Sequence, residues 1–374
     1  MDNGAGKCYD NGENFAQKGG AAGMKRLEAL DFTRVVAMLA VVMIHVSSTF
    51  IYSDSGFTVL GMNLGFMLNQ VTRFAVPLFI LISGMSLGIS TKGGSAVSFW
   101  KRRILKVGIP YVVWFFIYDL YNHGLDVGAY AKECLAAPRA LFRGLLLGQS
   151  APHLYFIIIL IQLYLVYPLL EKALKKAPVA TVALSFAVTC LIQCLYAFRR
   201  MGMDLIPKWI YPYLWLLLPT WVGYFALGAA LNKESIGRIY AFAARHAWTL
   251  LCGTVFFAAL YVVEAKVENS LDSIKTGLVA YVVLMVLATF ALWSKIQRWE
   301  WVKKTVAFLS ARSMTVYFCH VLVLYFFRRY AFFVSGMRGM LCLFAVVTLV
   351  SVWVGAMMDM AVGMVKENAV SLKK

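Results

Sequence analysis

The feature that most constrains this chain is an apolar stretch from Leu30 to Phe50 that carries ionisable residues. The stretch is long enough to cross a bilayer, because about 20 apolar residues in a helix span the hydrocarbon core. It holds Asp31 and Arg34 near its start and His45 deep inside, and a simple membrane anchor needs none of these groups. The stretch therefore predicts a helix whose polar side chains face a water-accessible groove between helices rather than lipid.

Helix geometry places two of these residues on one face. Arg34 and His45 are eleven positions apart, so at about 100° per residue they return to within about 20° of each other, about 16 Å apart along the axis. Asp31 precedes Arg34 by three residues, and we expect a hydrogen-bonded pair that orients the guanidinium. The alternative for His45 is a purely structural hydrogen bond to a neighbouring helix.

The composition is typical of a polytopic membrane protein. Of the 374 residues, 61% are hydrophobic and 14% are charged, which is far from the average soluble domain. The formal net charge of +18 does not indicate nucleic acid binding, because the basic residues occur in short clusters between apolar runs. The seven cysteines are scattered, without a metal-type pair or a disulfide framework, and we expect no metal.

Successive apolar segments predict an all-α membrane bundle of about ten transmembrane helices. Residues 1–24 are expected to be a flexible cytosolic tail, residues 25–365 the transmembrane domain, and residues 366–374 a short basic cytosolic tail. The longest connection, residues 122–152, has room for an interfacial helix. The expected spans are about 29–50, 62–90, 104–121, 153–171, 178–197, 210–231, 247–264, 277–294, 313–334 and 339–365.

Ten spans place both termini on one side of the membrane, and the basic residues indicate which side. The segments on the side of the termini carry roughly twice as many lysines and arginines as those on the other side. This excess predicts that both termini are cytosolic and that Arg34 lies at the cytosolic mouth of the bundle.

The second predicted span contains an arginine, Arg73, and a proline, Pro77, that is expected to kink it. Because this span runs inward, Arg73 is expected at the same depth as His45. An arginine at that depth is costly unless it is paired, so Arg73 is a candidate functional residue. The alternative is an arginine that reaches the outer surface at the start of a shorter span, residues 74–90.

Polar side chains in other spans are candidate supporting groups. Those that open the fourth span also fit an aromatic belt at the membrane surface. Those in the ninth span recur at intervals of three or four on one helix face, and interhelical hydrogen bonding alone gives the same pattern. The supporting residues are Ser83, His153, Tyr155, Ser313, Tyr317 and His320.

A histidine at mid-membrane and an arginine at the cytosolic mouth fit transfer from a large anionic donor. A neutral imidazole such as His45 can take a proton from a hydroxyl while that oxygen attacks a thioester. Arginines suit phosphates, and an extended phosphopantetheine arm spans the rise from Arg34 to His45. Arg73 is expected to stabilise the oxyanion or to bind the acceptor.

These motifs resemble the membrane acyltransferase type 3 family. The first span opens with L-D-x-x-R and reaches its histidine after ten further residues, and the second contains V-T-R-F-A-V-P-L-F-I-L-I-S-G-M. The segments H-L-Y-F and S-M-T-V-Y-F-C-H are also similar to the family's pattern. The likeness extends over about residues 25–365 and is to compact bacterial O-acetyltransferases of surface polysaccharide. Met85 and Tyr155 depart from it, since an aromatic residue and tryptophan are usual there.

The resemblance implies a ten-helix protein of the plasma (inner) membrane that moves acyl groups from acyl-CoA to carbohydrate. It also implies that His45 is essential and that Arg34 and Arg73 are functional. We predict an O-acyltransferase that uses acetyl-CoA, contacts membrane lipid and modifies a hydroxyl of a carbohydrate or cell-surface glycan. His45 is the expected general base, through direct transfer or an acyl-histidine intermediate, and Asp31 is expected to orient Arg34. The expected phosphate ligands are Arg34, Arg26, Arg102 and Arg103.

The rival from another functional class is a transporter or flippase of a glycan or lipid-linked sugar. It would use Arg73, His45 and His320 as substrate and proton sites. Transporters often carry internal repeats, whereas the second half of this chain does not repeat the pattern of the first span.

Overall fold

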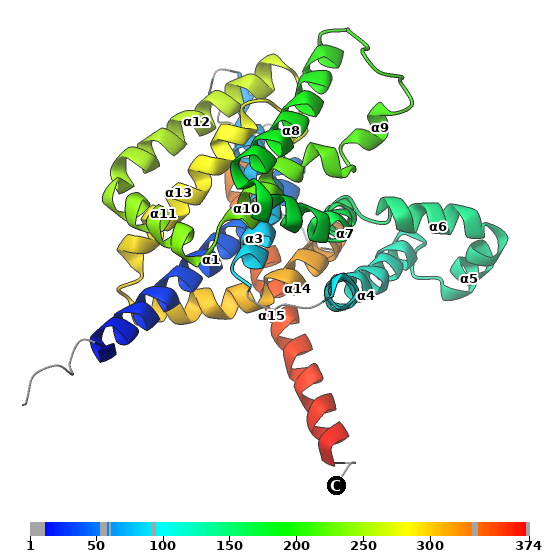
Figure 1. Cartoon of the computed structure of the whole chain (residues 1–374). Helices are drawn as coiled ribbons and strands as arrows, with labels where there is room; N and C mark the ends of the chain where they lie inside the picture. The colour runs from blue at the N-terminus through cyan, green and yellow to red at the C-terminus, as the bar shows by residue number, and fades with distance from the viewer. Residues whose placement is uncertain (1–11, 53–57, 60, 91–94, 331–335, 372–374) are drawn as a thin grey trace, which may run out of the picture.

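The computed structural model describes residues 12–52, 58–59, 61–90, 95–330 and 336–371. Most of these residues are helical, which confirms the predicted all-α class (Figure 1). Helices follow from the apolar runs, because a backbone in the bilayer core must satisfy its own hydrogen bonds. The strands that the described chain contains, β1 (Thr58–Val59) and β2 (Met62–Asn63), form one small antiparallel hairpin.

Nine helices of the described chain are long and apolar enough to cross a membrane. One of them is the unit α2–η1–α3, and the others are single helices. They comprise α1 (Gly12–Ser48), α2 (Leu64–Val71) with η1 (Thr72–Phe74) and α3 (Ala75–Gly88), α4 (Ala96–Asn122), α7 (Tyr155–Lys176), α8 (Pro178–Arg200), α12 (Ala247–Val267), α13 (Leu278–Ile296), α14 (Glu300–Tyr330) and α15 (Gly336–Ser371).

The predicted sixth span, residues 210–231, is not one continuous helix, whereas the other nine of the about ten expected spans are found in the described chain. The chain forms α9 (Tyr211–Leu214), η2 (Leu218–Thr220) and α10 (Val222–Ala230) instead. Pro212 and Pro219 lie in this segment, and proline has no amide hydrogen for a continuous helix.

The broken segment is nevertheless part of the core, because α10 packs closely along α3. A Cβ on Gly84 would lie 2.3 Å from the carbonyl oxygen of Phe225, and one on Gly228 would lie 2.1 Å from that of Leu81. Glycine at both positions lets the two backbones approach to this distance. The S-G-M segment of the second span therefore has a packing role.

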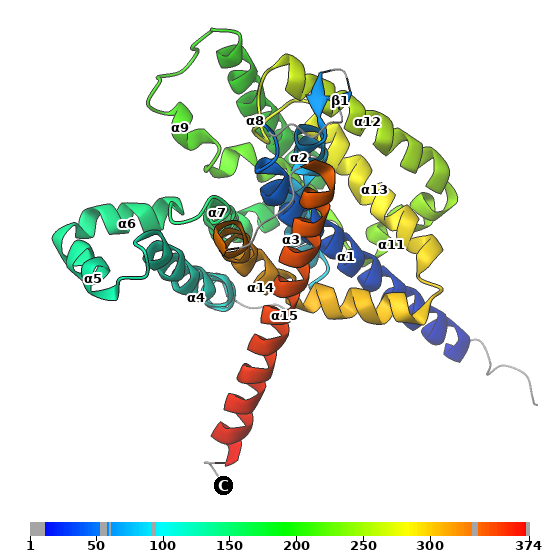
Figure 2. The ribbon, with the colours of Figure 1, turned by 180° about the vertical axis from the view of Figure 1, so that it is seen from behind.

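Helix α1 is the central helix of the bundle. In the apolar stretch of α1 that is long enough to cross a membrane, 72% is buried inside the protein, against 17% in the corresponding stretch of α8. It contacts α14, α3, α13 and α15 (Figures 1 and 2). By contrast, α4 exposes apolar side chains such as Leu105 and Ile109, as a lipid-facing helix does. The polar face of α1 is thus surrounded by protein.

The boundaries differ from prediction at both tails and in the longest connection. Helix α1 begins at Gly12 and α15 reaches Ser371, so parts of both predicted tails are helical, while residues 1–11 and 372–374 lie outside the described residues. The connection 122–152 contains α5 (Val127–Ala136) and α6 (Pro138–Leu147), which project from the bundle (Figure 1). Helix α11 (Lys233–Arg245) joins α10 to α12.

The start of α1 and the end of α15 point to the same end of the bundle, and β1 and α2 lie toward the opposite end (Figures 1 and 2). We call these the terminal end and the hairpin end. That both termini lie on one side of the membrane, and that this side is the cytosol, stay predictions.

Candidate functional site

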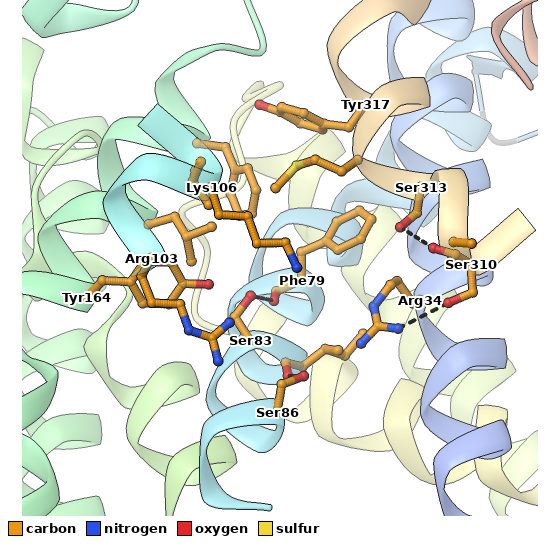
Figure 3. A pocket seen from close by; sticks show the side chains of 16 residues that line it. Arg34, Phe79, Ser83, Ser86, Arg103, Lys106, Tyr164, Ser310, Ser313 and Tyr317 are labelled. Carbon is orange, nitrogen blue, oxygen red and sulfur yellow. Dashed lines mark hydrogen bonds between the residues drawn. The ribbon is translucent and has the colours of Figure 1, made fainter. Parts of the chain in front are cut away.

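A cavity of about 470 Å³ lies between α1, α3, α4, α7 and α14 (Figure 3). This volume is in the range of small-molecule sites. Arg34, Arg103 and Lys106 reach into it from facing walls (Figure 3), and no acidic residue is among the described residues that line it. The cavity is therefore cationic. Its other polar lining residues are Ser83, Ser86, Tyr164, Ser310, Ser313 and Tyr317.

The predicted pair of Asp31 and Arg34 is present. Arg34 Nη1 donates to Asp31 Oδ1 at 2.5 Å and to Ser310 Oγ at 3.0 Å, and Ser310 Oγ donates to the same carboxylate oxygen at 2.8 Å. The triangle holds the guanidinium at the cavity wall and links α1 to α14. Asp31 thus positions Arg34 and is about 21 Å along the helix from His45.

The cations of α4 are only partly those expected from the sequence. Arg103 lines the cavity with its guanidinium carbon 5.7 Å from the ring centre of Tyr164. Arg102, the other predicted phosphate ligand of this helix, is exposed, and the structure does not bring it to the cavity wall. Lys106 lines the cavity and was missed, although its position three residues after Arg103 puts the two on one helix face. Arg26 lies in a part of α1 whose side chains the structure does not describe.

Three histidines meet beyond one end of the cavity. Tyr317, a lining residue, has its ring centre 5.2 Å from that of His153 and 6.2 Å from that of His320. The ring centre of His45 is 5.1 Å from that of His320 and 5.9 Å from that of His153. His153 and His320 are buried, whereas His45 is half-buried. The structure therefore brings together residues of α1, α14 and the segment before α7 that sequence reasoning had proposed separately.

The α14 backbone holds both buried histidines. His320 Nδ1 lies 3.0 Å from the carbonyl oxygen of Val316 and 2.8 Å from that of Tyr317. His153 Nε2 lies 3.3 Å from the carbonyl oxygen of Phe318, and the Tyr317 hydroxyl donates to the His153 carbonyl. These contacts fix where the two rings stand relative to α14.

Arg73 lies in η1, the 3₁₀ turn that breaks the second span. Pro77 has no amide hydrogen for the carbonyl of Arg73, four residues earlier, so the α-helical ladder is interrupted here. Arg73 donates to Asn69 Oδ1 through Nε at 3.1 Å and Nη2 at 2.7 Å. Asn69 Nδ2 donates to the carbonyl of Ile44 at 2.9 Å and to Ser47 Oγ at 3.3 Å. Both α1 residues flank the position of the candidate base.

Arg73 is consequently at the depth of His45, as predicted, and the two lie within electrostatic range of each other. The side chain is half-buried inside a candidate span that runs from Leu64 to Gly88, which favours this placement over the alternative of a shorter span, 74–90. Asn69 was missed by sequence reasoning. Its signal is an amide four residues before a buried arginine, on the same helix face.

The polar network continues from Asn69 to a buried lysine between α12 and α13. Gln70 Nε2 donates to Asn69 Oδ1 at 3.2 Å, and Lys275 Nζ donates to Gln70 Oε1 at 3.3 Å. Lys275 is fully buried, with an Asp272 carboxylate oxygen 3.9 Å from Nζ. Burial lowers the pKa of Lys275 to about 8, against an ordinary value of 10.5.

The remaining predicted supporting residues lie on two cavities. Ser83 and Ser313 line the cationic cavity, and each donates its hydroxyl hydrogen to its own helix, to the carbonyls of Phe79 and Ser310. Tyr155 lines a second cavity of about 210 Å³, together with Tyr213 and Trp215. Its ring centre is 4.7 Å from that of Trp215. Tyr155 also lies within electrostatic range of Arg73.

Comparisons with known proteins agree on one class of activity. A family model described as an acyltransferase domain matches residues 27–357. The chain is 23% identical over 303 residues to YfiQ of Bacillus subtilis (strain 168), whose name is that of a membrane-bound acyltransferase, and the match covers 79% of this chain and 80% of that protein. No solved structure matches significantly.

Proposed function

Because the chain belongs to this acyltransferase family and is a multi-pass membrane protein, we propose that it moves an acyl group from acyl-CoA to a hydroxyl of a carbohydrate or cell-surface glycan. One observation carries the proposal: a single cavity has three cations on its walls and ends at Tyr317, whose ring contacts the histidine cluster. This arrangement suits a donor with an anionic head and a long arm.

The cationic cavity is the proposed site of the coenzyme. Arg34, Arg103 and Lys106 suit phosphate groups, since guanidinium and ammonium groups form charge-assisted hydrogen bonds to them. The separation of about 16 Å along α1 between Arg34 and His45 is bridged by an extended phosphopantetheine arm. Acetyl is the proposed acyl group, and the proposed entry is from the cytosol.

His45 is the proposed general base. Its neutral imidazole accepts the proton of the acceptor hydroxyl while that oxygen attacks the thioester carbonyl. Arg73 is placed to stabilise the negative charge that develops on the carbonyl oxygen. Collapse of the tetrahedral intermediate breaks the carbon–sulfur bond, and the coenzyme thiolate takes the proton from the His45 imidazolium. The products are the acyl ester and free CoA.

The acceptor is proposed to approach through the second cavity. Tyr155 joins that cavity to the surroundings of Arg73, and Trp215 and Tyr213 provide amphipathic aromatic surface for a polyhydroxylated ligand.

The test uses acetyl-CoA labelled with ¹⁴C in the acetyl group and membranes from cells with and without the protein. We expect label to appear in a glycan fraction, with release of free CoA thiol, only when the protein is present. Mass spectrometry of surface glycans from the same cells should show an added acetyl mass. Transport of a glycan without consumption of the thioester would support the transporter instead and reject the proposal.

A further inference from the structure

Hydrogen bonding fixes which nitrogen of His320 carries its proton. Nδ1 faces the carbonyl oxygens of Val316 and Tyr317, and carbonyl oxygens only accept. No carboxylate contacts this ring within the described part of the chain, and a buried charge is costly at this depth, so the imidazole is neutral and has a single ring proton. Nδ1 therefore holds the proton, and Nε2 presents a lone pair. Nε2 is buried and has no hydrogen-bond partner among the described residues.

The same reasoning gives His153 the opposite tautomer. Nε2 faces the carbonyl of Phe318, so Nε2 holds the proton, and Nδ1 presents the lone pair. Nδ1 is also buried without a partner in the described structure. The two ring centres are 5.0 Å apart, but two lone pairs cannot hydrogen-bond to each other. A buried acceptor left unpaired is costly, so the cluster lacks a donor.

His45 can supply that donor. Its ring makes no hydrogen bond to any described residue, and its tautomer is therefore not fixed by a backbone group. Two imidazoles joined by a hydrogen bond of about 2.9 Å have ring centres about 5 Å apart. The observed separation of His45 and His320 is 5.1 Å, with the rings tilted by 53°. The ring separation therefore matches that of a hydrogen-bonded pair, and we expect a rotation of the His45 ring to form the bond.

We propose that His320 is a positioning residue for His45, and that its Nε2 accepts the ring N–H of His45 during acyl transfer. This inference rests on the proposed role of His45 as general base. The bond leaves the second nitrogen of His45 unprotonated and free for the acceptor hydroxyl. After proton uptake, the imidazolium keeps the same partner while it protonates the departing thiolate. A neutral acceptor here takes the place of the carboxylate in a serine protease triad and adds no buried charge.

Two substitutions of His320 separate this role from a structural one. Asparagine carries its amide near the position of Nδ1, so His320→Asn keeps a donor for the α14 carbonyls but removes the lone pair at Nε2. Glutamine reaches the position of Nε2, so His320→Gln restores an acceptor there. We expect His320→Asn to lower kcat about 100-fold, with KM for acetyl-CoA unchanged. The kcat of His320→Gln should be at least about tenfold higher than that of His320→Asn.

Nuclear magnetic resonance of protein with ¹⁵N-labelled histidine tests the inference without turnover. The chain has five histidines, and His123 and His246, which are outside the cluster, serve as internal references. We expect the spectrum to show His320 protonated at Nδ1, and the His45 resonances to move in His320→Asn. A His320 protonated at Nε2, or His45 resonances that His320→Asn leaves in place, would overturn the inference. Failure of the proposed function would show separately, as full transfer activity in His45→Ala.

Discussion

The cationic cavity and the histidine cluster are neighbours, yet they differ in charge and in how their side chains are held. The cavity has three cations on its walls, and its polar side chains are in part exposed to the space between the helices. The cluster consists of imidazole rings, and its two buried members are held by main-chain carbonyls of α14. Charge suits the binding of a phosphate head, while a base must stay neutral until the hydroxyl arrives. If the proposed roles hold, this difference in construction makes donor binding and proton transfer separable by mutation.

The largest effect is expected at the cluster. Replacement of His45 by alanine removes the proposed base, so kcat for acetyl transfer should fall at least about 1,000-fold. The affinity for CoA should stay close to the wild-type value, because His45 is not among the residues that line the cationic cavity. Calorimetric titration with CoA and label transfer from acetyl-CoA measure the two quantities. A comparable loss of CoA affinity would erase the distinction between the two regions.

Arg73 should give the next largest effect. Arg73→Gln removes the cation that we propose to face the developing oxyanion, and we expect kcat to fall about 100-fold. Asn69→Ala keeps the cation but removes the acceptor that orients it, so a smaller decrease of about tenfold is expected. Steady-state kinetics of both variants measure the order. Wild-type kcat and acceptor KM in Arg73→Gln would exclude Arg73 from the chemistry.

The neighbouring arginines of α4 provide a matched pair at the cavity. Arg103→Ala should raise KM for acetyl-CoA about 10- to 50-fold, as expected for the loss of a charge-assisted hydrogen bond, with little change in kcat. Arg102→Ala removes the same charge from the same helix but from an exposed position away from the cavity. Its KM should stay within about twofold of wild type. Equal effects of the two variants would mean that overall charge, and not the cavity, binds the donor.

The smallest effect concerns Lys275, at the far end of the Arg73 network. Its folded-state pKa of about 8 is below the ordinary 10.5, so between these values the unfolded chain binds more protons. The free energy of unfolding should therefore rise with pH, by about 2 kcal/mol from pH 7.5 to 9.5. Lys275→Met should remove this rise. Thermal denaturation of the wild type and of Lys275→Met in detergent measures this rise with pH. Parallel pH profiles of the two proteins would contradict the assignment of the rise to Lys275.

Local periodicity was sufficient to predict what lies within one helix. The shared face of Arg34 and His45 and the pairing of Asp31 with Arg34 depend only on helix geometry, and the continuous helix α1 and the ion pair agree with them. The prediction of one helix over residues 210–231 was wrong. It relied on the average apolarity of the segment and gave too little weight to Pro212 and Pro219, which interrupt a helix.

Helix periodicity does not predict which side chains meet between helices. Arg102 and Arg103 are adjacent in sequence but point about 100° apart, and which one faces a cavity depends on the rotation of α4 against its neighbours. The contact of Asn69 with α1 and the convergence of three histidines likewise depend on how the helices pack. The sequence contains the polar residues but not their interhelical distances.

The central claim is that one cavity leads a coenzyme from the cations to His45. The most direct test is a cryo-electron microscopy structure of the protein with CoA bound. We predict phosphates against Arg34, Arg103 and Lys106, and the sulfur at the Tyr317 end of the cavity, next to the histidine cluster. A CoA whose sulfur points away from His45, or one bound outside this cavity, would contradict the account.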